Sequence, residues 1–128
     1  MYTLNLNGRI RIVDKPMVMG ILNITPDSFY AGSRTPGLAE SVDRAAAMIE
    51  AGASILDIGG QSTRPGSLRI GASEEAGRVL PVIEALHKAF PDTVLSSDTY
   101  HAEVARAAVR AGAGMINDIS GGNMDPGM

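Results

Sequence analysis

The sequence of 128 residues contains no cysteine and no tryptophan, and aromatic residues make up only 4% of it. The absence of cysteine excludes a disulfide scaffold, a cysteine-ligated zinc site and a thiol nucleophile. No apolar run approaches the ~20 residues that a membrane helix needs, and residues 1–8 lack the pattern of a signal peptide. The net charge of −3 argues against non-specific binding to nucleic acid or to an anionic membrane. We therefore expect a cytoplasmic protein that binds neither.

The residues that are present indicate a single small α/β domain. A hydrophobic content of 45% and a charged content of 20% are ordinary for a globular chain of this length. The 15 glycines indicate many tight turns between the elements. Short apolar runs alternate along the chain with longer segments of helical periodicity. This alternation predicts parallel strands joined by right-handed crossovers.

The expected elements begin with a β-hairpin at residues 4–13, with Asn7-Gly8 at its turn. Four strands are expected at residues 16–24, 55–60, 94–97 and 115–119. The first is a continuous apolar run, which suits a strand buried on both faces. Three helices are expected at residues 38–49, 74–90 and 101–111. Pro81 lies inside the second helix and predicts a kink or a break there. The histidines of the second and third helices, His87 and His101, are interpreted as surface residues.

A short internal repeat fits this regular order. Residues 51–57 (AGASILD) match residues 111–117 (AGAGMIN) at an offset of 60 residues, which is two strand–helix units. Each copy runs from the end of a helix through a buried strand to a polar residue. A common way of joining a helix to a strand explains the match as well as a true repeat does, so both explanations stay open.

Polar residues end all four expected strands, and in chain order they are Asn23, Asp57, Asp98, and Asn117 with Asp118. The carboxyl ends of parallel strands lie on one face, where ligands bind in barrels and open α/β sheets. Carboxylates accept hydrogen bonds and carboxamides both donate and accept, which suits a nitrogen heterocycle. The same oxygens suit Mg²⁺. Taken singly, the two earlier aspartates could be caps, and Asn117-Asp118 could be a turn. Four strands ending alike favour a binding site.

Two loops carry further polar chemistry, residues 25–29 (TPDSF) and residues 62–66 (STRPG). Arg64, with Thr63 and Ser62, could grip phosphate oxygens through its guanidinium group and the two hydroxyls. The alternative is a Pro-Gly turn with a solvated arginine. Both connections are long for loops between a strand and a helix, which is typical of segments that cover a substrate.

Residues 19–29 (MGILNITPDSF) resemble the first signature of the dihydropteroate synthase family, and residues 57–66 (DIGGQSTRPG) resemble the second. Residues 97–100 (SDTY) and 117–122 (NDISGG) are similar to the ends of its third and fourth strands. The resemblance implies an α/β fold that is the first half of a TIM (β/α)8 barrel, with a hairpin before four parallel strands and three helices. Residues 1–128 would then be a partial pterin-binding domain, since a barrel typically needs ~250 residues.

The resemblance also implies a reaction of folate biosynthesis. In it, 6-hydroxymethyl-7,8-dihydropterin diphosphate and p-aminobenzoate give 7,8-dihydropteroate and diphosphate, with Mg²⁺ assisting, and the enzyme is a sulfonamide target. In the route it implies, diphosphate leaves before the amine attacks. The implied catalytic residues are Asp98, Asn117 and Arg64. Asn23 would help to hold Mg²⁺ and the diphosphate, and Thr63 and Arg64 would contact the pterin diphosphate. Asp98 and Asn117 would hydrogen-bond to the pterin ring, and Asp57 would line the floor of the pocket. Asp27, Ser28 and Phe29 would lie beside the aminobenzoate site.

The family's later catalytic residues and its dimer-forming helices have no counterpart in these residues. We therefore expect the complete enzyme to be a homodimer through that other half, and this chain alone to be aggregation-prone or partly molten, and inactive. Gln61 stands where many members carry glutamate, which we interpret as tolerated variation. The alternatives are a methyltetrahydrofolate-type methyltransferase, against which the two loops speak, a non-catalytic pterin-binding half-barrel, and a generic strand–helix domain without a pterin site.

Overall fold

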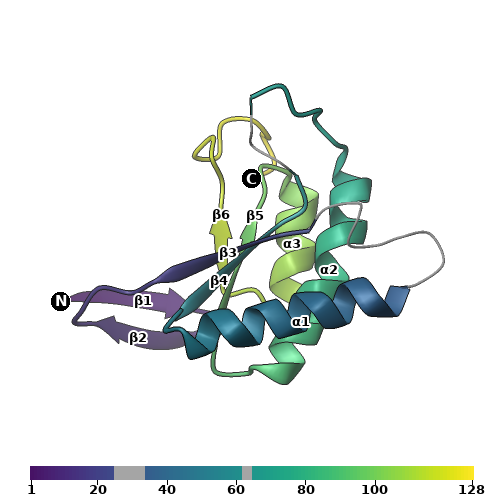
Figure 1. Ribbon diagram of the computed structural model, residues 1–128. Coiled ribbons are helices and arrows are strands. Elements are labelled where there is room, and N and C mark those ends of the chain that lie inside the picture. The colour runs from purple at the N-terminus through teal and green to yellow at the C-terminus, as the bar shows by residue number, and fades with distance from the viewer. Residues whose placement is uncertain (25–33, 62–64) are drawn as a thin grey trace.

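The computed structural model describes residues 1–24, 34–61 and 65–128, with the side chains of residues 34–36 left out. Within these residues the strands are β1 (Tyr2–Leu6), β2 (Arg9–Val13), β3 (Met19–Asn23), β4 (Ile55–Gly59), β5 (Val94–Asp98) and β6 (Met115–Asn117). The helices are α1 (Arg34–Glu50), α2 (Ala72–Ala89) and α3 (Ala102–Ala111). After the hairpin, strands and helices alternate as the sequence predicts (Figure 1).

The hairpin of β1 and β2 is antiparallel and closes through a two-residue turn. Asn7 and Gly8 have φ values of 53° and 78°, and positive φ at both positions is the type I′ geometry that matches the twist of the strands. The Asn7 side-chain amide donates a hydrogen bond of 3.1 Å to the Ala113 carbonyl. The predicted hairpin is confirmed, and its tip is fastened beside the amino end of β6.

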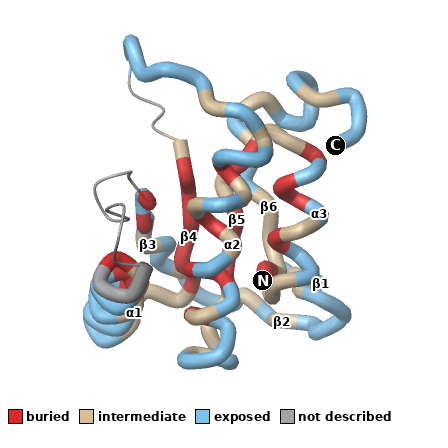
Figure 2. Tube along the Cα trace, turned by 90° about the vertical axis from the view of Figure 1, so that its right-hand side faces the viewer, coloured by how far each residue is buried: buried red, intermediate tan, exposed pale blue. Residues whose placement is uncertain are grey.

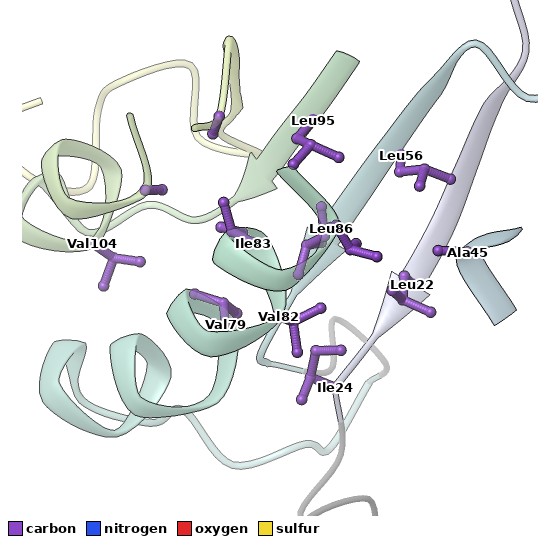
Figure 3. Packing of buried hydrophobic residues seen from close by; sticks show 13 residues of the cluster. Leu22, Ile24, Ala45, Leu56, Val79, Val82, Ile83, Leu86, Leu95 and Val104 are labelled. Atoms are coloured by element: carbon purple, nitrogen blue, oxygen red, sulfur yellow. The ribbon is translucent and has the colours of Figure 1, made fainter. Parts of the chain in front are cut away.

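The other four strands form one parallel sheet in the order β3-β4-β5-β6. Its helix-facing residues pack against an apolar stripe on α2. The side chains of this stripe are wholly buried, and they are Val79, Val82, Ile83 and Leu86. Figure 3 shows this stripe between the strand residues Leu22, Leu56 and Leu95 and the α3 residue Val104. Burial of this apolar surface, at about 25 cal/mol per Å², is the main force that holds the helices on the sheet.

The two copies of the internal repeat end their helices in the same way. Gly52 and Gly112 follow α1 and α3 with φ values of 110° and 125°. In each copy the next residue donates a backbone hydrogen bond to the carbonyl five positions earlier, at 3.0 Å and 2.9 Å, which is the Schellman way of ending a helix. A Cβ on Gly112 would lie 2.5 Å from Cγ of His87, so α2 and α3 approach closely there.

Three expectations are wrong in detail. β3 is not buried on both faces as predicted. It pairs only with β4 in the described sheet, and its residue Ile21 is 60% exposed. β4, which has a strand on each side, is the strand buried along its whole length (Figure 2). The break that Pro81 predicts does not occur, since α2 continues from Ala72 to Ala89, because burial on both sides of the proline outweighs its cost of about 3 kcal/mol; a kink at Pro81 stays a prediction. His101 is not a surface residue, since its side chain is only 22% exposed.

Candidate functional site

The ends of the parallel strands bring the predicted polar residues into one row. Asn23, Gly59, Asp98 and Asn117 are successive cross-strand partners at the carboxyl ends of β3, β4, β5 and β6. Side chains alternate between faces along a strand. Since Leu22, the neighbour of Asn23, packs toward the helices, the row faces away from them.

Gly59 lies between two members of this row. A Cβ added to Gly59 would lie 3.5 Å from Asn23 Oδ1 and 3.5 Å from Asp98 Oδ2. The amide and the carboxylate therefore stand on either side of a position that carries no side chain, and a ligand can approach the backbone between them.

Asp57 lies on the same face of β4 as Gly59, two residues before it. It is the middle residue of β4, so it does not lie at a strand end as predicted. Asn117 Nδ2 donates a hydrogen bond of 2.9 Å to Asp57 Oδ2 across β5. These two residues occupy equivalent positions in the internal repeat. Asp57 is only 3% exposed, and its Oδ1 has no hydrogen-bond partner among the described residues.

Ser96 is a site residue that the sequence analysis missed. It is the cross-strand partner of Asp57 and of Met115, it is fully buried, and its hydroxyl has no hydrogen-bond partner in the described part of the chain. The signal that could have found it is the two-residue period of a strand, which puts Ser96 on the same face as Asp98. The floor of the site therefore offers a buried hydroxyl as well as a carboxylate.

The Asp98 carboxyl has an unusual affinity for its proton. Burial, with a smaller contribution from the nearby carboxylates of Asp57, Glu75 and Asp118, raises its pKa from 3.8 to about 6. A carboxylate with this pKa still ionises near neutral pH, and it accepts a hydrogen bond from an N–H donor strongly because it is poorly solvated.

Asp118 has a different role from the row. Its carboxylate accepts hydrogen bonds from Ser120 N at 2.8 Å, from Ser120 Oγ at 2.7 Å and from Gly122 N at 3.0 Å. These bonds lower its pKa. The turn interpretation therefore holds for Asp118, which is occupied with the loop after β6.

The remaining predicted site residues, Asp27, Ser28, Phe29, Thr63 and Arg64, lie outside the described residues. The residues on either side of the second loop nevertheless have defined contacts. Gln61 Oε1 accepts a hydrogen bond of 3.1 Å from the Tyr100 hydroxyl, and the Ile70 carbonyl lies 3.2 Å from His101 Nε2.

A row of amide and carboxylate groups at the carboxyl ends of parallel strands lies where enzymes of this α/β architecture bind their ligands. Residues 19–128 match the family described as pterin binding enzymes, and the chain belongs to this family. The resemblance stated from the motifs is confirmed, and so is the fold as the first half of a TIM barrel.

Similar proteins within this family are dihydropteroate synthases and proteins of folic acid synthesis. The chain is 50% identical over 115 residues to the dihydropteroate synthase of Bacillus subtilis, covering 90% of this chain and 40% of that protein. It is 52% identical over 111 residues to the folic acid synthesis protein fol1 of Pneumocystis carinii, covering 87% of this chain and 15% of that protein. The structure of Xanthomonas albilineans dihydropteroate synthase with 4-aminobenzoic acid aligns with a TM-score of 0.85 and 46% identity, over 98% of this chain and 46% of that one. The chain thus spans less than half the length of these relatives.

Among the described residues, no group of three or more histidine, aspartate or glutamate side chains could hold a metal ion. None of the described helices is long and apolar enough to cross a membrane.

Proposed function

We propose that this chain supplies the pterin-binding half of a dihydropteroate synthase. The reaction joins 6-hydroxymethyl-7,8-dihydropterin diphosphate to p-aminobenzoate and releases diphosphate. The observation that supports it best is the poorly solvated Asp98 carboxylate beside Asn117, in a chain about 50% identical to such synthases. An anionic acceptor next to an amide matches the N–H donors and ring-nitrogen acceptors of a pterin.

The chemistry assigned to these residues is polarisation and positioning. Asp98 accepts a hydrogen bond from a ring N–H, which increases the electron density of the pterin. The carbon–oxygen bond to the diphosphate breaks first, and the electron pair leaves with the diphosphate. The electron-rich pterin stabilises the resulting methylene cation. The amine of p-aminobenzoate then attacks this carbon and loses a proton. Asn117 orients the ring, and Asp57 holds the Asn117 amide through the bond of 2.9 Å.

Arg64 and Thr63 are assigned to the pterin diphosphate, and Asp27, Ser28 and Phe29 to the p-aminobenzoate side, which is also where a sulfonamide competitor would act. We further propose that residues 1–128 form part of one larger pterin-binding domain. The complete enzyme would be a cytoplasmic homodimer whose interface lies outside these residues.

Mg²⁺ fits the row through Asn23. Mg²⁺ usually keeps several waters and shares substrate phosphates, so it does not need a cage of protein carboxylates. Asn23 is the exposed last residue of β3, and its Oδ1 lies on the open side of Gly59. This single amide oxygen suits an ion that is held mainly by diphosphate and water. When bound there, the ion would neutralise charge on the departing diphosphate.

The test is a chimera in which residues 19–128 of this chain replace the matching segment of Bacillus subtilis dihydropteroate synthase. We expect the purified chimera to form 7,8-dihydropteroate from the pterin diphosphate and p-aminobenzoate. The same chimera carrying Asp98→Ala should lose at least about tenfold in kcat/KM, since a hydrogen bond to a charged group contributes roughly 1.5–3 kcal/mol. We expect the 128-residue chain alone to show no turnover.

Two results would contradict the proposal. A folded chimera that forms no dihydropteroate would refute the synthase assignment. A chimera that instead transfers a methyl group from methyltetrahydrofolate would assign the chain to the other branch of pterin chemistry. Omitting Mg²⁺ should lower the turnover of the chimera, and Asn23→Ala should raise the Mg²⁺ concentration needed for half-maximal rate.

A further inference from the structure

Glu75 is a buried carboxyl group that the proposed reaction does not use. It lies in the first turn of α2, on the helix side of the sheet, and is only 1% exposed. Its Oε1 has no hydrogen-bond partner among the described residues. Burial raises the pKa of Glu75 above its usual value of 4.5. Neighbouring Glu74, by contrast, has a side chain that is 57% exposed and pairs with Arg78.

The contacts of Glu75 are with the ends of β4 and β5. The Thr99 hydroxyl hydrogen-bonds to the Glu75 carboxyl, and His101 Nε2 lies 3.8 Å from Glu75 Oε2. A Cβ on Gly60 would lie 3.3 Å from Glu75 Cγ, so the chain leaving β4 passes directly over this side chain. One turn further along α2, Arg78 Nη1 donates a hydrogen bond of 2.8 Å to the Gly60 carbonyl.

Thr99 connects Glu75 to the row of site residues. Thr99 follows Asp98 directly, is 3% exposed, and donates its backbone N–H to the Asn117 carbonyl at 3.0 Å. Its Oγ1 accepts the backbone N–H of His101 at 3.0 Å. A hydroxyl oxygen that already accepts a bond still has its proton to donate, and Glu75 is the acceptor. One residue thus holds together the ends of β5 and β6 and the start of α2.

We propose that Glu75 and Thr99 are positioning residues that hold Asp98 and Asn117 in the geometry that binds the pterin. The inference rests on the proposed function. A buried carboxyl group that only stabilised the dipole of α2 would not need a partner at the end of β5. The bond to Thr99 instead fixes a residue that follows Asp98 directly and donates its backbone N–H to Asn117, and small displacements of such groups weaken binding strongly.

The experiment uses the chimera and measures the dissociation constant of the pterin diphosphate and the KM of each substrate. Glu75→Leu and Thr99→Val each remove the bond, and we expect each to weaken pterin binding about tenfold while the KM for p-aminobenzoate stays within twofold. Glu75→Gln and Thr99→Ser keep an acceptor and a donor, so both should bind pterin within about threefold of the parent. The double variant Glu75→Leu/Thr99→Val should bind no more weakly than the weaker single variant.

Glu74→Gln is the matched control, because it changes the adjacent, exposed glutamate of the same helix turn. It should leave both substrates unaffected. Melting temperatures of all variants separate loss of fold from loss of binding. A Glu75→Leu chimera that melts earlier but binds pterin as the parent does would refute the positioning role and leave the synthase assignment intact. Equal losses for both substrates would also refute it. A parent chimera that binds no pterin would refute both.

Discussion

Asp98→Asn should stabilise the fold at neutral pH while it weakens pterin binding. The pKa of the Asp98 carboxyl rises from 3.8 to about 6 because folding buries it near other carboxylates. The folded state therefore holds this proton more tightly than the unfolded state does. Below about pH 3 the group is mostly protonated in both states and adds almost no destabilisation. As the pH rises from about 3 to about 6, the unfolded chain ionises more readily than the folded one, so the free energy of unfolding falls, and above about pH 7 the full destabilisation is present.

The size of this effect follows from the shift. A rise from 3.8 to about 6 corresponds to about 3 kcal/mol at about 1.36 kcal/mol per pH unit. Asp98 is only half-buried, so solvent screening reduces the figure, and we expect about 1–1.5 kcal/mol. The asparagine variant has no ionised form, and this destabilisation disappears. Its binding of pterin diphosphate should fall at least about tenfold, because the charged acceptor is lost.

The assay is urea unfolding of the parent chimera and of its Asp98→Asn variant at pH 4.0 and at pH 7.5. The measured quantity is the change with pH in the stability difference between the two proteins, because it cancels effects of the substitution that do not depend on ionisation. The variant should gain about 1 kcal/mol on going from pH 4.0 to pH 7.5. The same stability difference at both pH values would refute the argument that a poorly solvated charge at Asp98 opposes folding.

Three further variants test the packing of the fold, each by urea unfolding of the chimera. Gly112→Ala should destabilise by at least about 2 kcal/mol, because its φ is 125° and its Cβ would clash with the α2 imidazole; Gly66→Ala, with φ 84° and no atom within 4 Å, is the control and should cost about 1 kcal/mol. Ser97→Ala should stabilise by roughly 1 kcal/mol, since it removes a buried hydroxyl without a described partner; a loss of stability would show that this hydroxyl has one. Asn117→Ala should destabilise by about 1–3 kcal/mol, because it leaves the buried Asp57 carboxylate without its donor, and an unchanged stability would contradict that bond.

The features that the sequence predicts well are local or periodic. The Asn7-Gly8 turn is decided by two residues, and the parallel order of strands follows from alternation of strand and helix patterns. The convergence of Asn23, Asp98 and Asn117 follows as well, because it depends only on where each strand ends. The catalytic assignments of these residues stay predictions.

The features that the sequence could not predict depend on distant partners. Pro81 opposes the helix locally, and only the burial of α2 against the sheet decides that the helix continues. The exposure of Ile21 depends on β3 lying at an edge of the described sheet. His101 looks like a surface residue until Glu75, 26 positions earlier, is placed 3.8 Å from its ring. Pairing between elements is the information that a single sequence does not carry.

Buried polar atoms without a described hydrogen-bond partner lie on both faces of the sheet. Toward the helices the cluster of buried side chains is apolar. That cluster is nevertheless bordered by Glu75 and Ser97, each with such an atom. On the open face, Asp57 and Ser96 each have one, and the charge on Asp98 opposes folding. Each such group destabilises the fold by about 1–3 kcal/mol until it gains a hydrogen-bond partner. A ligand with several N–H groups and ring nitrogens would satisfy those on the open face. Substitutions there that stabilise the empty protein should therefore be the ones that weaken pterin binding.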